Sequence, residues 1–535
     1  MSLNAQDVQP VLELVPLLYR GPGGAVAVLK DGELISQHVW GYADMEKRIP
    51  ITPDTLIPIC SITKQFVCAL LIDLERNPTP GMVGKGDVKK QLFEKLKEWL
   101  PKEVTQDSGL TIDNLCDMQS GIRDYWAMTT LWGAKPDDRF TLNDAKSILS
   151  RIKSFHFEPG TQYSYSNVNF YLLGRLIEEV AGESLENLLS ERIFGPAKME
   201  TARLRPDTSQ LPPPCVGYEG IEQDGFVPAK NFIEWSGDAG IVASLTDMIA
   251  YEKYFDSRWL DPQDPYRATV EARTFKDGSP ARYRYGLGHV NIGNVATVGH
   301  GGALRGFRLR RLYAKRERIS VVVMFNHEAE AGEASAWVLR KILDQFDTTV
   351  SSVQPVRDWF GAFLDKDTQL AVTVRPGRTG RISISFAGYP EAVGIVAADR
   401  AESRDMSAKI DGNSLHIRRL QDNLIINATR INQNDTIPES SSLRGSYHCS
   451  EMDSTFHCEG SADMLYGGFD GSLGKGAANL MRRVGGNVWI LACPRGLDAP
   501  APGDWTLVFH RDENGAIVSV TIGCWLSRRL EYRRV

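Results

Sequence analysis

The sequence lacks any run of apolar residues long enough to cross a membrane as a helix, which takes about 18 consecutive apolar residues. It also lacks a secretion signal. The segment from Met1 to Arg20 has no basic start, and Asp7 and Glu13 interrupt its apolar stretch. These absences predict a cytoplasmic protein without a membrane partner.

An excess of basic charge is missing as well. The chain has 61 basic and 67 acidic residues, which give a formal net charge of −6. The short basic runs at 308–316 and 528–534 alternate with apolar residues, a pattern typical of exposed strand faces. Proteins that bind nucleic acid carry a basic domain or stripe, so we expect no nucleic-acid partner.

The eight cysteines include no CxxC pair, which favours buried free thiols in a large chain without a secretion signal. His448-Cys449 and His457-Cys458 could suggest zinc, but neighbours on a strand point to opposite faces. Gly21 to Gly24 is glycine-rich, yet no G-K-[ST] follows, so it is no phosphate loop. We therefore expect no metal and no organic cofactor.

A length of 535 residues predicts several domains. The first part mixes helix spacing, after Ser61 and over Val168 to Val180, with strands that form an antiparallel meander from Tyr285 to Phe325. A helix is expected over Ala334 to Phe346. Beyond it, short alternating strands with turn residues between them dominate, as in barrels and sandwiches.

Polar stretches at 347–354 and 432–442 read as linkers. The segments 361–363 and 445–447 each precede a polar turn and an alternating strand, which suggests that two similar β domains follow one another. We predict an α+β chain: a domain over 1–346 with an antiparallel sheet flanked by helices, then two antiparallel β-barrel domains over 347–435 and 436–535.

Ser61-Ile62-Thr63-Lys64 opens a helical pattern. Residues three apart share a helix face, so the hydroxyl of Ser61 and the amine of Lys64 are expected in contact. A serine needs a group that takes its proton before it becomes a good nucleophile, and a helix N-terminus suits a developing oxyanion. The alternative is that Ser61 caps the helix at the protein surface and that Lys64 is exposed to solvent.

Tyr165-Ser166-Asn167 precedes a second helical pattern. A nearby ammonium favours the phenolate of a tyrosine, so we expect Tyr165 to serve as general base and later as acid. The amide of Asn167 can hold both the lysine and a substrate amide. The alternative is a polar turn that caps the helix.

His300-Gly301-Gly302 lies inside the strand meander. Two glycines weaken a strand unless another backbone approaches closely, and a substrate lying alongside as an extra strand is one such backbone. The N–H of Ala303 would then complete an oxyanion hole with the N–H of Ser61. Alternatively, His300 ends a strand and the glycines form a bulge or turn.

The order S-x-x-K, Y-x-N and H-x-G, spaced by about 100 and then about 130 residues, resembles the serine β-lactamase and penicillin-binding superfamily. The Y-x-N and H-x-G forms are most similar to its branch of class C β-lactamases, DD-peptidases and esterases. Segments 115–122, with Met118 where histidine is usual, and 239–247 also fit. The resemblance covers Pro22 to about Phe346 and implies a β-lactamase-like catalytic domain.

With its two β domains, the whole chain is similar to the three-domain bacterial aminopeptidases of this branch, which act on N-terminal D-residues. In that family an acidic residue, on a third-domain loop that enters the catalytic cleft, binds the substrate's amino group. The matching position is Asp498, where Pro500 and Pro502 restrict the loop. From the residues alone, Asp498 reads as an exposed turn residue. The segments that carry the likeness are 58–66, 300–306, 496–505, 523–525 and 531–535.

The resemblance implies a serine aminopeptidase that hydrolyses small D-peptides, amides or esters through an acyl-enzyme on Ser61. Its expected catalytic residues are Ser61, Lys64, Tyr165 and His300, with His300 supporting Tyr165 or the leaving group. Its expected substrate-binding residues are Asn167, Gly302, Ala303 and Asp498. The residues leave open whether Lys64 or Tyr165 is the base.

Two other functions stay open. A DD-peptidase, β-lactamase or esterase could use the same scaffold, and a protein of another class, an inactive penicillin-binding-like protein, could retain the fold. The complete motif set argues against an inactive protein. The resemblance also implies a small substrate with a free N-terminus, a homodimer and inhibition by β-lactams.

Overall fold

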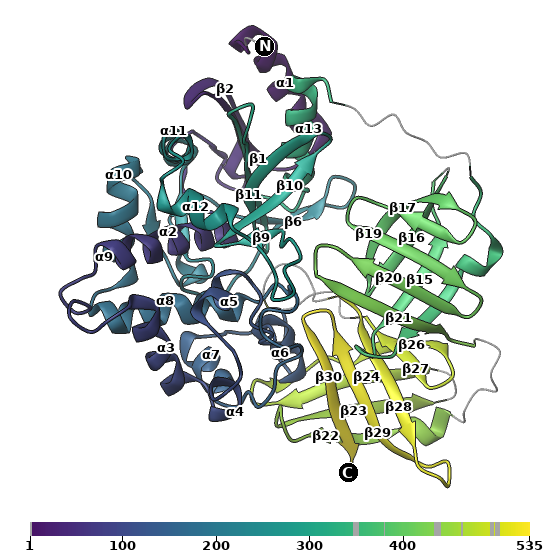
Figure 1. Cartoon of the computed structure of the whole chain (residues 1–535). Helices are drawn as coiled ribbons and strands as arrows, with labels where there is room; N and C mark the ends of the chain where they lie inside the picture. The colour runs from purple at the N-terminus through teal and green to yellow at the C-terminus, as the bar shows by residue number, and fades with distance from the viewer. Residues whose placement is uncertain are drawn as a thin grey trace.

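The computed structural model describes residues 3–345, 353–378, 380–432, 440–461, 464–492, 497 and 503–535. An N-terminal α/β part, coloured purple to teal, adjoins two all-β units in green and yellow (Figure 1). Among the described residues, no helix is both long and apolar enough to span a bilayer. The α+β architecture with two closed barrels confirms the predicted fold class.

One antiparallel sheet forms the centre of the N-terminal part. Its four consecutive strands β13, β12, β11 and β10 confirm the predicted meander. The segment His300-Gly301-Gly302 lies within β11, which continues to Leu304. The strands, in spatial order, are β3 Ile49–Pro50, β2 Glu33–Asp44, β1 Gly23–Lys30, β13 Ile319–Phe325, β12 Phe307–Ala314, β11 Val295–Leu304, β10 Leu287–Ile292 and β9 Tyr283–Arg284.

Helices cover both faces of this sheet. On one face Val8 and Leu12 of α1 and Val338 of α13 pack against Val321 of β13. On the other face α11 packs against β1 and β13, and Gln65 of α2 accepts from Arg311 of β12 at 3.4 Å; a larger helical group lies beyond them (Figure 1). The helices are α1 Ala5–Leu18, α2 Thr63–Arg76, α3 Val88–Trp99, α4 Lys102–Thr105, α5 Ile112–Cys116, α6 Tyr125–Leu131, α7 Leu142–Leu149, α8 Asn167–Ala181, α9 Leu185–Leu189, α10 Gly195–Ala197, α11 Leu245–Leu260, α12 Pro265–Glu271 and α13 Ala331–Leu343.

A buried ion pair joins α11 to the sheet. Arg311 of β12 donates to both carboxylate oxygens of Glu252, at 2.7 and 2.6 Å, and both side chains are fully buried. Ser320 of β13 also donates to Glu252, at 2.6 Å. The ion pair fixes the position of β12, and β12 in turn supports β11.

The first β unit is a closed barrel around a core that includes Phe363 and Ile384. Every neighbouring pair of its strands is antiparallel. Its strands are β14 Gly361–Asp365, β15 Ala371–Pro376, β16 Arg381–Phe386, β17 Tyr389–Ala397, β18 Arg400–Glu402, β19 Met406–Asp411, β20 Ser414–Arg419 and β21 Leu424–Arg430.

The second β unit is closed by the pairing of β23 with β24, and β25 extends from β24. Its strands are β22 Gly445–Cys449, β23 Ser454–Ser461, β24 Met464–Gly471, β25 Gly474–Lys475, β26 Asn479–Gly485, β27 Val488–Leu491, β28 Trp505–Arg511, β29 Ile517–Cys524 and β30 Ser527–Arg534.

The two barrels share one structural corner, which supports the internal repeat read from the sequence. Gly361 and Gly445 open the first strand of their barrels with φ of 142° and 144°, where glycine is favoured. An arginine from the last strand of each barrel packs against an aromatic ring of that barrel's first strand. Arg430 lies 4.6 Å from the ring centre of Phe363, and Arg534 lies 5.9 Å from that of Tyr447.

Both barrels contact the N-terminal part. Tyr163 donates its backbone N–H to the carbonyl of Asp422 in the first barrel, at 3.0 Å. Trp132 donates its indole N–H to the carbonyl of Met452 in the second barrel, at 2.6 Å. Residues of all three regions are therefore held close to one another around the site.

Candidate active site

Ser61 lies where the chain turns into α2. A short 3₁₀ turn, Cys60–Ile62, precedes the helix. Cys60 adopts a φ of 51°, a left-handed conformation that is rare for a residue with a side chain and is concentrated at functional sites. This turn leaves the Ser61 side chain partly exposed, while Cys60 and Ile62 on either side are buried.

Lys64 is fully buried one turn further on. Its Nζ donates to Ser61 Oγ at 2.9 Å, to Asn167 Oδ1 at 2.9 Å and to the carbonyl oxygen of Asp238 at 2.6 Å. These acceptors match the three N–H bonds of an ammonium. The predicted contact between Ser61 and Lys64 is therefore present, and Asn167 joins it as expected.

Asn167 opens α8 and is held by Asp124. The backbone N–H of Asn167 donates to Asp124 Oδ1 at 2.7 Å, and its side-chain amide approaches the same oxygen at 3.4 Å. Asp124 in turn donates its own N–H to the carbonyl of Leu526, in the turn between β29 and β30 of the second barrel, at 3.2 Å. A chain of hydrogen bonds thus links the second barrel to Lys64.

Met118 supports the same segment. Its thioether accepts from the N–H of Ser166 and from the side chain of Asn169, both at 3.3 Å. A histidine is usual at this position in the families that the sequence resembles. Here the methionine sulfur provides the acceptor below the Tyr165–Asn167 turn.

Asp238 contributes its backbone carbonyl to Lys64, and its carboxylate fixes that carbonyl in place. The carboxylate accepts from the N–H of Ser236 at 2.7 Å and from the hydroxyl of Tyr125. Asp238 is fully buried, and burial raises the pKa of its carboxyl group.

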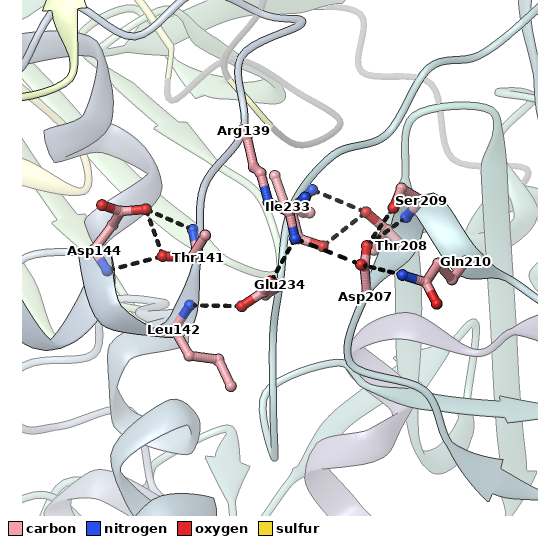
Figure 2. Close-up of polar contacts among 10 residues, drawn as sticks. All are labelled: Arg139, Thr141, Leu142, Asp144, Asp207, Thr208, Ser209, Gln210, Ile233 and Glu234. Atoms are coloured by element: carbon pink, nitrogen blue, oxygen red, sulfur yellow. Dashed lines mark hydrogen bonds and ion pairs between the residues drawn. The ribbon is translucent and has the colours of Figure 1, made fainter.

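The segment that leads into Asp238 is held from two sides (Figure 2). Glu234 accepts from the N–H of Leu142, the first residue of α7, at 3.1 Å and from Arg139 at 2.9 Å. Ile233 exchanges hydrogen bonds of 3.0 and 2.8 Å with the hydroxyl of Thr208. The loop is thereby fixed a few residues before the carbonyl that receives Lys64.

Tyr165 lines the same cavity as Ser61. Lys64 Nζ lies 5.0 Å from the ring centre of Tyr165. Burial raises the pKa of Tyr165 well above its usual value, although Ser61 opposes this shift. Burial therefore disfavours the phenolate, and the role of Tyr165 as general base stays a prediction.

His300 lies beside Tyr165, with ring centres 6.1 Å apart. Burial, together with the charge of Lys64, lowers the pKa of His300 to about 3, so the ring is neutral at pH 7. Its Nδ1 lies 2.6 Å from the carbonyl of Gly301 and its Nε2 lies 3.0 Å from the hydroxyl of Tyr283. A neutral ring fits these partners when Nδ1 donates to Gly301 and Nε2 accepts from Tyr283.

Gly302 brings β11 against the nucleophile turn. A Cβ at this position would lie 2.3 Å from the carbonyl oxygen of Ile59. The expected close backbone approach is present, but its partner here is the turn before Ser61 and not only a substrate. Ala303, the next residue, lines the same cavity as Ser61.

This cavity has a volume of about 640 Å³ and is bordered by all three regions of the chain. Trp126 and Trp235 contribute from the N-terminal part, Tyr389 from the first barrel, and Trp525 and Leu526 from the second. The size and the aromatic lining suit a small organic substrate.

Asp498 lies outside the described residues, so its expected approach to the cleft remains a prediction. Its neighbour Leu497 is described and buried, with 3% of its surface exposed. Asp124, Asp238 and Tyr283 are site residues that the sequence reasoning missed. Asp124 and Asp238 lie next to the segments 115–122 and 239–247, which resemble the superfamily. Only this proximity could have pointed to them in the sequence.

Comparison with known proteins agrees with this geometry. A family profile described as "Beta-lactamase" matches residues 12–344, and one described as "D-aminopeptidase, domain B" matches residues 352–533. D-aminopeptidase of Brucella anthropi is 42% identical over 537 residues, covering 100% of this chain and 99% of that protein. D-aminopeptidase of Brucella canis is 40% identical over 539 residues, covering all of both chains.

Solved structures share the fold at lower identity. The octameric penicillin-binding protein homologue from Pyrococcus abyssi has a TM-score of 0.55 at 18% identity, covering 80% of this chain and 100% of that one. The D-amino acid amidase from Ochrobactrum anthropi SV3 has a TM-score of 0.51 at 21% identity, covering 63% of this chain and 99% of that one.

Asp124 makes stability depend on pH. Burial raises the pKa of Asp124 to about 7, against the opposing effects of the Asn167 N–H and of Lys64. Between pH 4 and 7 the folded protein holds this proton more tightly than the unfolded chain, so the contribution of Asp124 to the unfolding free energy falls as the pH rises. Asp124→Asn stays neutral, and its stability relative to wild type should improve by on the order of 2 kcal/mol between pH 5 and 8.

Urea unfolding at the two pH values measures this change. The exposed Asp224→Asn variant is the control, and its difference from wild type should stay constant within about 0.5 kcal/mol. A difference for Asp124→Asn that is equal at both pH values would show that this carboxyl group is already ionised at pH 5.

Proposed function

The chain belongs to the D-aminopeptidase family of β-lactamase-like serine hydrolases, and we propose that it removes the N-terminal D-residue of small peptides, amides and esters through an acyl-enzyme on Ser61. The observation that carries this proposal is the hydrogen bond from Lys64 to Ser61, a residue that lines a cavity of suitable size.

Acylation begins when Ser61 Oγ attacks the carbonyl carbon of the first residue. The reactive form of the site carries one proton fewer on the pair formed by Lys64 and Tyr165, and this pair accepts the proton that Oγ loses. The carbonyl oxygen becomes an oxyanion that accepts from the N–H groups of Ser61 and Ala303. The tetrahedral intermediate then collapses, and Tyr165 gives a proton to the departing amine.

Deacylation reverses these roles with water as the nucleophile. Tyr165 and Lys64 take a proton from the water, its oxygen attacks the ester carbonyl, and Ser61 Oγ leaves with a proton returned to it. The free D-amino acid is released. In this scheme neutral His300 holds the strand beside Tyr165 and supports the leaving-group side of the site.

Substrate binds along β11. The last pair between β10 and β11 joins Gly288 to Gly299, and residues 300–303 have no strand partner on that side among the described residues. An extended peptide can add to such an edge through backbone hydrogen bonds. Asn167 completes the site by binding the substrate's backbone amide while it holds Lys64.

Asp498 is proposed to bind the substrate's free ammonium and to exclude a longer N-terminal chain. Two observations support this role. The second barrel reaches the cavity through Trp525 and Leu526. In addition, Leu497 is anchored in the hydrophobic cluster that the second barrel shares with the N-terminal part.

We also propose the wider organisation read from the sequence: domains at 1–346, 347–435 and 436–535, a homodimer, a cytoplasmic location and inhibition by β-lactams. The cysteines give independent support to the location. Cys68, Cys116, Cys215, Cys449 and Cys458 are buried free thiols, which are typical of a reducing compartment.

Rates on D- and L-alanine p-nitroanilide, measured side by side, test the function. We expect kcat/KM to favour the D-isomer by roughly two orders of magnitude or more. Ser61→Ala should lower kcat by on the order of 10⁴-fold or more, because it removes the nucleophile. Ser190→Ala, an exposed serine of the same domain, should retain full activity. Equal rates on the two isomers refute stereospecificity, and activity that survives Ser61→Ala refutes the mechanism.

The role of Asp498 calls for a comparison of D-alanine p-nitroanilide with its N-acetylated form. Asp498→Asn keeps the shape of the side chain and removes its charge. We expect it to reduce kcat/KM on the free amine by about 10- to 100-fold, and to change use of the acetylated substrate far less. An equal loss on both substrates would assign Asp498 a structural role instead.

A further inference from the structure

Arg310 presents a guanidinium to the active-site cavity. It lies on β12, directly opposite Gly301 of β11, and it lines the cavity that contains Ser61. A Cβ built on Gly301 would lie 3.6 Å from Arg310 Nη1, so the guanidinium extends over the position where any other residue would have its side chain. Glycine at 301 thus leaves this part of the cavity open beside a positive charge.

The neighbouring arginines have protein partners. Arg308 pairs with Glu328 at 3.3 Å and donates to two backbone carbonyls, and Arg311 pairs with Glu252. Within the described part of the chain, Arg310 has neither an ion pair nor a hydrogen-bond acceptor. Glu330 lines the same cavity, yet it forms no ion pair with Arg310 among these residues.

A cation in this position needs an anion. Burial and the neighbouring Arg311 lower the pKa of Arg310 to about 10, which still leaves the guanidinium charged at neutral pH. A partly buried charge without a partner is unfavourable. A guanidinium has a planar fork of donors that matches a carboxylate, and such a ligand would supply the missing partner.

The direction of the site places Arg310 on the leaving-group side. The oxyanion lies at Ser61 and Ala303, and the proton for the departing amine comes from Tyr165, beside His300. The leaving group therefore extends from Ala303 toward His300 and Gly301. In a dipeptide substrate, the leaving residue carries its carboxylate only a few atoms beyond the departing nitrogen.

We propose that Arg310 binds the free α-carboxylate of the leaving amino acid, so that dipeptides with an N-terminal D-residue are better substrates than the corresponding dipeptide amides. This inference rests on the proposed acyl-enzyme mechanism and adds a determinant of leaving-group specificity to it. Arg310 touches the substrate in this scheme but takes no part in proton transfer.

The test compares D-alanyl-glycine with D-alanyl-glycinamide, following release of D-alanine by chromatography. Wild type should favour the free acid by about 10- to 100-fold in kcat/KM. Arg310→Met should abolish this preference, mainly through a higher KM on the acid, and change kcat/KM on the amide by less than about threefold. Arg310→Lys should retain part of the preference, since it keeps the charge but not the fork.

Arg316→Met is the matched control, because it removes an exposed positive charge beyond the far end of the same strand. It should keep the wild-type preference. The proposal is overturned if Arg310→Met lowers both substrates equally, or if wild type shows no preference for the acid. Two other results would instead refute the proposed function: wild type that does not prefer D-substrates, or a Ser61→Ala variant that still hydrolyses them. Both results are independent of the ratio of kcat/KM on the acid to kcat/KM on the amide.

Discussion

The site depends on one buried amine. Lys64 has no exposed surface, and its amine contacts a serine, an amide and a backbone carbonyl that come from three distant segments of the chain. A buried amine is stable only when its hydrogen bonds are satisfied. The segments at Ser61, Asn167 and Asp238 must therefore be held together, and the hydrogen bonds of Asp124 to Asn167 and of Ser236 to Asp238 contribute to this.

The barrels belong to this arrangement. The carbonyl of Leu526 holds Asp124, Asp124 holds Asn167, and Asn167 holds Lys64. The first barrel contributes through Asp422, which accepts from Tyr163 two residues before Tyr165. The groups around Ser61 are thus positioned by contacts between regions as well as by their own domain. The same three regions border the cavity.

Local features of the site could be predicted from the sequence, and long-range ones could not. The contact of Ser61 with Lys64 follows from helical spacing, and the strand meander follows from turns and alternation. No sequence pattern indicates the contacts of the Asp238 carbonyl and the Asp124 carboxyl group, because these contacts depend on how separate segments pack. The burial of Tyr165, which raises its pKa, could not be predicted for the same reason, since burial is set by the whole fold. Arg310 could be singled out only after its neighbours were seen to be paired.

The central claim is an acyl-enzyme on Ser61, and mass spectrometry after rapid acid quench tests it most directly. The enzyme is mixed with D-alanine p-nitrophenyl ester, quenched within milliseconds and digested with pepsin at low pH. We expect one D-alanyl increment on the peptide that contains Ser61, and none with the L-ester. Hydrolysis without an adduct, or an adduct on another residue, would contradict it.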